Sequence, residues 1–234
     1  MKKEYLVPEP VTKSETYFAK DSQWLIHKTP LYGFAIKSGH NAEPHNHNDV
    51  GAFILAANGR QAVTDLGSGP YSKQYFDKST RYNTLYCSSR SHSVPIINGC
   101  YQHEGAEFAA CDTVFENGVF SSNIAGAYPI PELKKLVRTV SFDKDAVNLK
   151  DSFDYDGDGT LVERISVTEE PVIKGDGEIY IGNGVTIRFD ASAIRSLDIL
   201  SEPAKAGRIV YFIDFTLAEE VIGIEFKFSV KEVK

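Results

Sequence analysis

The dipeptide Asn58-Gly59 constrains the fold most, because it separates two strand-like segments at residues 51–57 and 60–66. Asn-Gly is the strongest short-range signal for a two-residue type I′ hairpin, since both turn positions need a positive φ. If the two residues that flank the turn pair, paired residue numbers sum to 57 + 60 = 117, and Asp65 falls opposite Ala52. The hairpin therefore predicts Asp65 at its open end, near the segment that precedes residue 51.

Short segments that alternate apolar and polar residues recur along the whole chain, and Gly-rich or Asn-rich turns separate them. Such alternation is typical of half-buried antiparallel strands. A chain of 234 residues is long enough to bury the core of one large β-sandwich. We therefore predict an all-β fold of two stacked antiparallel sheets over residues 21–234, preceded by a polar N-terminal segment at residues 1–20. The further strands expected lie at residues 24–28, 31–37, 113–115, 134–142, 146–153, 160–167, 184–189, 208–215 and 221–230.

A run of potential ligands, His45-Asn46-His47-Asn48-Asp49, lies just before the first strand of the hairpin. In extended backbone, His45, His47 and Asp49 would lie on one face. Neutral imidazoles and carboxylates are common ligands of zinc and similar cations, and a metal-free histidine transfers protons near neutral pH. The run therefore predicts a functional site, and hairpin geometry adds Asp65 to it. Taken alone, Asp65 would equally fit a cap on the turn that follows it.

His92 precedes a second apolar run at residues 94–97. A lone histidine there is more often a satisfied residue at a strand end than a ligand. Its combination with His47 and Asp65 shifts the interpretation towards a shared site.

The chain resembles the C-terminal β domain of the heparinase II/III-like polysaccharide lyases. The stretches that carry the resemblance are GHNAEPHNHNDVGAFIL, AVTDLGSGPYSKQYF and RSHSVPIING, in this order. The resemblance implies that His45 works at the catalytic centre and that His47, Asp65 and His92 bind a metal, usually zinc. It implies that Asp49 holds an imidazole ring in its tautomer. Substrate contacts are expected from Tyr71, Tyr75 and Arg81.

In the resembled family an α/α toroid precedes the β domain and supplies a catalytic tyrosine. This chain shows no sustained 3.6-residue apolar period, so we expect no toroid within it. The implied reaction is β-elimination on a uronate-containing polysaccharide, with a structural metal and with the isolated chain inactive. The family is commonly exported in bacteria, so the resemblance implies a periplasmic or secreted location.

The net charge of −7 and pI near 5.4 argue against a surface that binds polyanions in general, and no basic stripe interleaves with aromatic residues. We therefore expect no nucleic-acid partner. We also expect no membrane partner, because no apolar run is long enough to cross a bilayer. An acidic polysaccharide can still bind in a local cleft, and the basic residue Arg81 is close to the predicted site in the sequence.

Two other classes of function remain open. A non-catalytic carbohydrate-binding module would keep the sandwich but has no need for the histidines and Asp65. A cupin-type metal enzyme fits the spacing from Gly39 to His45 and His47, but the cupin pattern then needs a glutamate where this chain has Gly51 and Ala52. The cupin interpretation therefore lacks a ligand.

Overall fold

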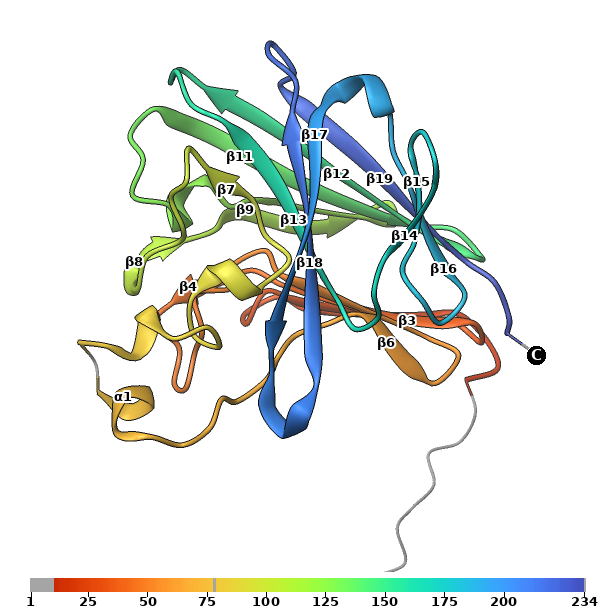
Figure 1. The fold of residues 1–234 in the computed structure, drawn as a ribbon, viewed down its shortest axis with the longest axis horizontal. Coiled ribbons are helices and arrows are strands. Elements are labelled where there is room, and N and C mark those ends of the chain that lie inside the picture. The colour runs from red at the N-terminus through yellow and green to blue at the C-terminus, as the bar shows by residue number, and fades with distance from the viewer. Residues whose placement is uncertain (1–10, 78, 234) are drawn as a thin grey trace, which may run out of the picture.

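The structure, a computed structural model, describes residues 11–77 and 79–233. Two large antiparallel sheets stack on one another, as the alternating segments predict (Figure 1). The prediction of an all-β sandwich is therefore confirmed. No helix among the described residues has the length and apolar character needed to span a bilayer.

The first sheet follows the order β1-β2-β3-β5-β6-β13-β18-β17, and the short strand β7 also pairs with β13. The edge strand β1 belongs to the predicted N-terminal segment, so the sheet begins inside residues 1–20; residues 1–10 of that segment lie outside the described residues. The strands of this sheet are β1 (Glu15–Ala19), β2 (Trp24–Lys28), β3 (Tyr32–Lys37), β5 (Phe53–Ala57), β6 (Arg60–Val63), β7 (Ile96–Ile97), β13 (Leu161–Val167), β17 (Ile194–Pro203) and β18 (Ile209–Leu217).

The second sheet follows the order β14-β15-β16-β19-β12-β11-β10-β9, and β4 with β8 forms a small separate ladder. These strands are β4 (His40–Asn41), β8 (Gly105–Ala109), β9 (Cys111–Glu116), β10 (Val119–Asn123), β11 (Leu133–Phe142), β12 (Ala146–Tyr155), β14 (Val172–Gly175), β15 (Glu178–Tyr180), β16 (Val185–Arg188) and β19 (Gly223–Val230). Helical structure in the described residues is limited to α1 (Lys73–Phe76) and the 3-10 turns η1 (Arg81–Asn83), η2 (Ser89–Ser91), η3 (Ala125–Ala127), η4 (Ala191–Ala193) and η5 (Lys205–Gly207).

The apolar residues of the alternating segments are the ones that are buried in the core. In β19, Ile224, Phe226 and Phe228 are buried while the residues between them face outward. Phe53 of the first sheet contacts Phe228 of the second edge to face, with ring centroids 5.6 Å apart. The main core therefore lies between the two sheets, where apolar side chains from both are removed from water.

The predicted hairpin forms, with one change in register. Asn58 and Gly59 both have a positive φ, at 50° and 75°, and Ala57 pairs with Arg60. A β-bulge then shifts the pairing so that Leu55 lies opposite Val63. The predicted register beyond the bulge is wrong by one residue, because a bulge inserts an extra residue on one strand.

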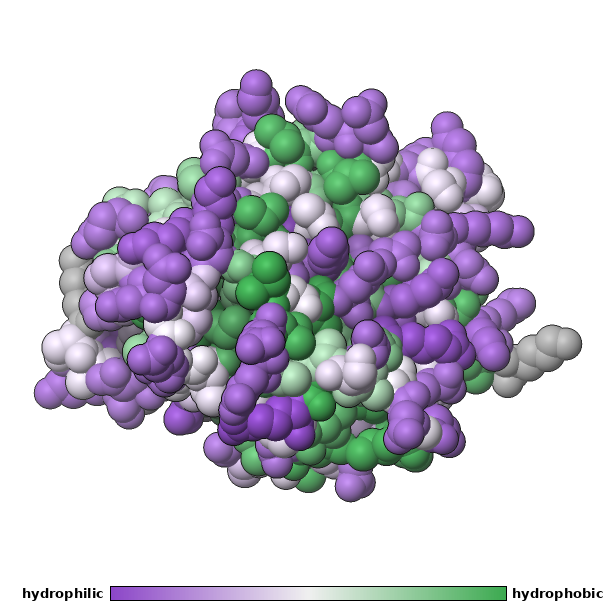
Figure 2. Space-filling view, turned by 90° about the horizontal axis from the view of Figure 1, so that it is seen from above, coloured by the Kyte–Doolittle hydropathy of each residue, from purple (hydrophilic) through white to green (hydrophobic). Residues whose placement is uncertain are grey.

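The visible face in Figure 2 is mostly hydrophilic, with hydrophobic side chains gathered towards its middle. This agrees with a chain in which 24% of the residues are charged.

Candidate metal centre and adjoining pocket

Two segments meet at β13 and create the site. β6 pairs with one end of β13 through Val63 and Val167, and β7 pairs with the other end. If the pairing of β6 continued past Val63, and that of β7 continued back from Ile96, both segments would reach the middle of β13. Only one segment can pair there. The segment after β6 and the segment before β7 therefore leave the sheet side by side, which brings Asp65 next to His92.

Four side chains converge at this point: His47, Asp49, Asp65 and His92. One nitrogen or carboxylate oxygen from each lies within 4.8 Å of one from every other member. The imidazole rings of His47 and His92 have centroids 5.3 Å apart. The sequence analysis named all four residues, and the structure brings them together. We call this group the His/Asp cluster.

His92 is 1% exposed, and its two ring nitrogens have different surroundings. Nε2 lies 3.2 Å from the carbonyl oxygen of Tyr86, which fixes the proton on Nε2. Nδ1 lies 2.8 Å from Oδ2 of Asp65, yet it has no hydrogen-bond partner of suitable geometry among the described residues. Closeness without alignment is expected of two groups that point at a common third atom.

Asp65 combines both of the roles that the sequence allowed. Its Oδ1 accepts a hydrogen bond of 2.6 Å from the backbone N–H of Gly67, as a turn cap does. Its Oδ2 faces His92. Although burial opposes both shifts, each residue favours the charged form of the other, so the pKa of Asp65 is lowered and the pKa of His92 is raised.

His47 is held in its neutral form. Burial, together with the nearby His92 imidazole, lowers the pKa of His47 to about 4. The unprotonated nitrogen of its neutral ring can therefore act as a ligand at physiological pH.

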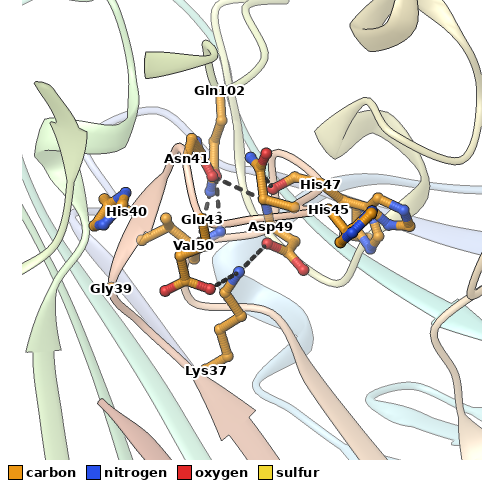
Figure 3. A network of polar contacts seen from close by, with 12 residues as sticks. Lys37, Gly39, His40, Asn41, Glu43, His45, His47, Asp49, Val50 and Gln102 are labelled. Atoms are coloured by element: carbon orange, nitrogen blue, oxygen red, sulfur yellow. Dashed lines mark hydrogen bonds and ion pairs between the residues drawn. The ribbon is translucent and has the colours of Figure 1, made fainter. Parts of the chain in front are cut away.

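Asp49 lies inside the cluster and not behind it. We expected Asp49 to hold an imidazole ring, but among the described residues its carboxylate accepts a hydrogen bond of 2.8 Å from Nζ of Lys37. Lys37 also lies 3.2 Å from Oε2 of Glu43, so it bridges the two carboxylates (Figure 3). Against the effect of burial, Asp49 raises the pKa of Lys37. The imidazole contact that we assigned to Asp49 belongs to Asp65.

His45 lies outside the cluster. The prediction that residues 45–49 are extended, with His45, His47 and Asp49 on one face, is wrong: this segment is a loop, and His45 has a φ of 61°. His45 is therefore exposed, whereas His47 turns inward. The histidine that the resemblance assigns to catalysis is separated from those that it assigns to metal binding.

Arg81 holds this loop in place. Its Nη2 donates to the carbonyl oxygens of Asn46 at 2.9 Å and of His45 at 3.4 Å. Tyr82 adds a hydrogen bond of 2.8 Å from its hydroxyl to the Asn46 side chain. The guanidinium of Arg81 thus supports the backbone around His45, and its expected contact with substrate stays a prediction.

A buried amide network supports the loop from its other side. Gln102 exchanges two hydrogen bonds with the backbone of Val50, at 2.9 and 2.7 Å. Asn41 donates to Gln102 and accepts from the backbone N–H of Asp49 (Figure 3). Sequence reasoning missed Gln102 and Asn41, because only the fold shows that they are near the loop.

A buried charged group lies behind the cluster. Arg138 of β11 donates to Asp151 of β12 at 2.9 Å and to Glu163 of β13 at 3.2 Å. Its Nη1 donates to the carbonyl oxygens of Gly51 and Ser93, at 2.7 and 2.8 Å. These two carbonyls follow Asp49 and His92 closely in the chain. Arg138 therefore ties both site segments to the opposite sheet.

A pocket of about 330 Å³ opens beside the His/Asp cluster and is lined by all four of its residues. His45 lines it as well, together with Lys37 and Trp24. Neither Tyr71 nor Tyr75 is part of this wall. Tyr71 is 74% exposed elsewhere, and Tyr75 is buried in a small separate apolar cluster. Neither tyrosine is therefore placed at this pocket, and their contact with substrate stays a prediction.

The fold and the site define a β-sandwich domain in which a cluster of potential metal ligands lies at the edge of a pocket. The family described as "Heparinase II/III-like, C-terminal" matches residues 19–209. The chain belongs to this family. No curated protein matches the chain.

Solved structures of polysaccharide lyases share the fold. A mutant of the heparan sulfate lyase HepC from Pedobacter heparinus has a TM-score of 0.70 and 17% identity, over 97% of this chain and 38% of that one. A heparinase III structure has a TM-score of 0.69 and 16% identity, over 95% and 38%. A chondroitin AC lyase of Streptomyces coelicolor A3, in complex with chondroitin sulphate, has a TM-score of 0.50 and 10% identity, over 97% and 34%. The chain therefore spans less than two fifths of each of these proteins.

Proposed function

We propose that this chain is the metal-binding β domain of a polysaccharide lyase that cleaves a uronate-containing glycan by β-elimination. The observation that carries the proposal is the convergence of His47, Asp49, Asp65 and His92 beside a pocket that also contains His45. The names of the similar lyases, which act on heparan sulfate or chondroitin, support the choice of an acidic polysaccharide.

The residues of the cluster fit a divalent cation, with zinc preferred. Two imidazoles and two carboxylates are common zinc ligands, and the two carboxylates offset the charge of the ion. Nδ1 of His92 is buried and has no hydrogen-bond partner of suitable geometry among the described residues, so it can bind an ion once its proton is displaced. His47 is neutral because its pKa is lowered to about 4. When bound, the metal would link the loop at residues 45–49 to the segments of Asp65 and His92, a structural role.

His45 is the residue of this chain that we assign to proton transfer. In the elimination, the C5–H bond of the uronate and the bond from C4 to the glycosidic oxygen break, and a C4–C5 double bond forms. A base takes the C5 proton and an acid protonates the departing oxygen. His45 is exposed in the pocket and is not a member of the cluster, so its ring nitrogens are free for one of these steps.

The second proton carrier would come from the helical domain that precedes the β domain in this family. Base and acid must reach different atoms of the sugar, and among the described residues of the pocket lining only His45 is an exposed proton carrier. We therefore propose that the isolated chain is inactive. Loss of one partner in acid–base catalysis typically lowers the rate about 10²–10⁴-fold.

The test is the absorbance of the unsaturated uronate product, with heparan, chondroitin and alginate substrates. We expect no turnover by the isolated zinc-loaded chain, and turnover by a longer chain that carries the helical domain. His45→Ala should abolish that turnover, whereas His103→Ala, which changes an exposed histidine outside the pocket, should not. Equal turnover by the His45→Ala variant would refute the assignment of His45. Zinc binding with no turnover by the longer chain would favour a carbohydrate-binding module.

A further inference from the structure

Trp24 is the only tryptophan of the chain, and it lies in the wall of the pocket that contains His45. It is the first residue of β2 and pairs in register with Lys37 of β3. Directly paired residues project from the same face of an antiparallel sheet. The indole ring therefore borders the pocket next to the Lys37 side chain that bridges Glu43 and Asp49 (Figure 3 shows this bridge).

Trp24 is not part of the hydrophobic core. Its side chain is 41% exposed, whereas the next residue, Leu25, is fully buried. Among the described residues, Trp24 belongs to neither hydrophobic cluster and stacks on no other aromatic ring. Its cross-strand partner on the other side is Ala19, which is too small to cover an indole. The largest apolar side chain in the sequence is thus left open to a ligand in the pocket.

The charges around Trp24 decide which kind of sugar ring fits there. Lys37 is already paired with two carboxylates, Glu43 and Asp49, so it is not free to pair with the carboxylate of a charged ring. Among the described residues that line the pocket there is no other lysine or arginine, so a charged ring on Trp24 would lack a cationic partner. An uncharged ring can place its apolar C–H face on the indole and its hydroxyl groups towards the polar side chains, which matches the mixed character of the pocket.

We propose that Trp24 is the stacking platform for an uncharged sugar ring of the glycan, next to the uronate on which His45 acts. This inference rests on the proposed function, because it assumes that the glycan occupies this pocket. The expected substrate is then a polymer in which uronates alternate with uncharged sugar rings. A polymer made of uronates alone would have to place a charged ring on Trp24.

Fluorescence provides a direct test, because Trp24 is the only tryptophan of the chain. The probes are a heparosan tetrasaccharide, in which glucuronate alternates with N-acetylglucosamine, and an alginate tetrasaccharide, in which every ring is a uronate. With the zinc-loaded chain we expect a saturable change in tryptophan emission with heparosan, and weaker binding of alginate. Equal or tighter binding of alginate would overturn the proposal.

Variants separate this inference from the proposed function. Trp24→Ala should weaken heparosan binding about 2- to 10-fold by titration calorimetry, since one aromatic contact is worth roughly 0.5–1.5 kcal/mol, and Trp24→Phe should retain part of the affinity. The control is Tyr17→Ala, which removes an aromatic residue that is 66% exposed on the neighbouring strand β1 and is not in the pocket. All three variants should bind zinc like the wild type, which also shows that they fold.

Unchanged heparosan affinity in Trp24→Ala would overturn the stacking role and leave the proposed function intact. Emission that does not change at saturating heparosan would overturn it in the same way. If the wild-type chain binds zinc but no glycan, both the stacking role and the glycan pocket are wrong, whereas the metal site stands.

Discussion

Two clusters of charged residues lie on either side of the carbonyl groups of Gly51 and Ser93, and they differ in how completely their groups are paired. Behind these carbonyls, Arg138, Asp151 and Glu163 are each at most 1% exposed. In front of them, the His/Asp cluster opens to a pocket. The same short segments therefore separate a closed group of charges from an open one.

The closed group is close to neutral within the protein. Burial, reinforced by Asp151, raises the pKa of Glu163 well above its usual value, which favours its protonated, neutral form. One arginine then balances one aspartate. Among the described residues Oε1 of Glu163 accepts no hydrogen bond, whereas the protonated carboxyl can donate one to Asp151. Nothing in this group requires a ligand.

The open group is different, because its polar atoms are not all paired with one another. Lys37 pairs with Asp49 from beside the cluster, whereas the ligand atoms of all four members converge at the pocket. Nδ1 of His92 has no hydrogen-bond partner of suitable geometry among the described residues. The comparison sets a group whose charges are paired among themselves against one whose ligand atoms face a pocket, and the proposed metal site rests on this difference.

The largest effect should come from breaking the closed group. Arg138→Met leaves Asp151 charged and buried and frees the carbonyls of Gly51 and Ser93, so we expect a loss of about 3–5 kcal/mol in the free energy of unfolding. Urea denaturation measures it. The control is Arg188→Met, which removes an exposed ion pair with Glu178 and should cost less than about 1 kcal/mol. Equal losses in the two variants would contradict the comparison.

The next effect concerns the metal ion that we propose for the open group. Zinc at 100 times its dissociation constant should stabilise the chain by about 2.7 kcal/mol, seen as a higher melting temperature that EDTA reverses. His47→Ala should lose most of this gain, whereas His103→Ala should keep it. A zinc-induced shift that persists in His47→Ala would place the ion elsewhere.

Zinc binding should also depend on pH. Because the raised pKa of His92 reflects a proton that zinc must displace, affinity should rise with pH up to that pKa, by at most about tenfold per pH unit. The same raised pKa stabilises the metal-free fold below about pH 6.5, and this contribution is lost as the pH rises through the folded pKa. The thermal shift caused by zinc should therefore be larger at pH 8 than at pH 6. A shift that does not vary over this range would contradict the assignment of His92.

The smallest effect should come from a change that leaves the closed group neutral. Glu163→Gln imitates the protonated carboxyl, so at pH 5 the stability should change by no more than about 1 kcal/mol. The raised pKa of Glu163 means that its contribution is lost as the pH rises, so the variant should gain on the wild type from pH 5 to pH 8. A strongly destabilised variant at both values of pH would show that Glu163 is ionised.

Local sequence patterns predicted most of the fold, because alternation and turn residues act over a few positions. The hairpin at Asn58-Gly59 and the strands with one buried face follow from them. The long edge strand β17 was missed, since most of its residues are exposed on both faces and it has no apolar alternation. The bulge in β6 was missed because it depends on how the strand meets β13.

The residues that converge at the candidate site could be named from the sequence, but the contacts that support them could not. His47, Asp65 and His92 could be named because motif and hairpin geometry point to them. The positive φ of His45, the bridge made by Lys37 and the contacts of Arg138 and Gln102 were missed. They join residues that are far apart in the sequence, so no local pattern contains them.

The central claim is that the open cluster binds one metal ion while His45 stays free. X-ray absorption at the zinc edge of the loaded chain tests it most directly. We predict nitrogen and oxygen ligands at about 2.0–2.2 Å, with scattering from two imidazoles that is unchanged in His45→Ala and reduced to one imidazole in His92→Ala. A spectrum that loses an imidazole in His45→Ala, or that is unchanged in His92→Ala, would contradict the account.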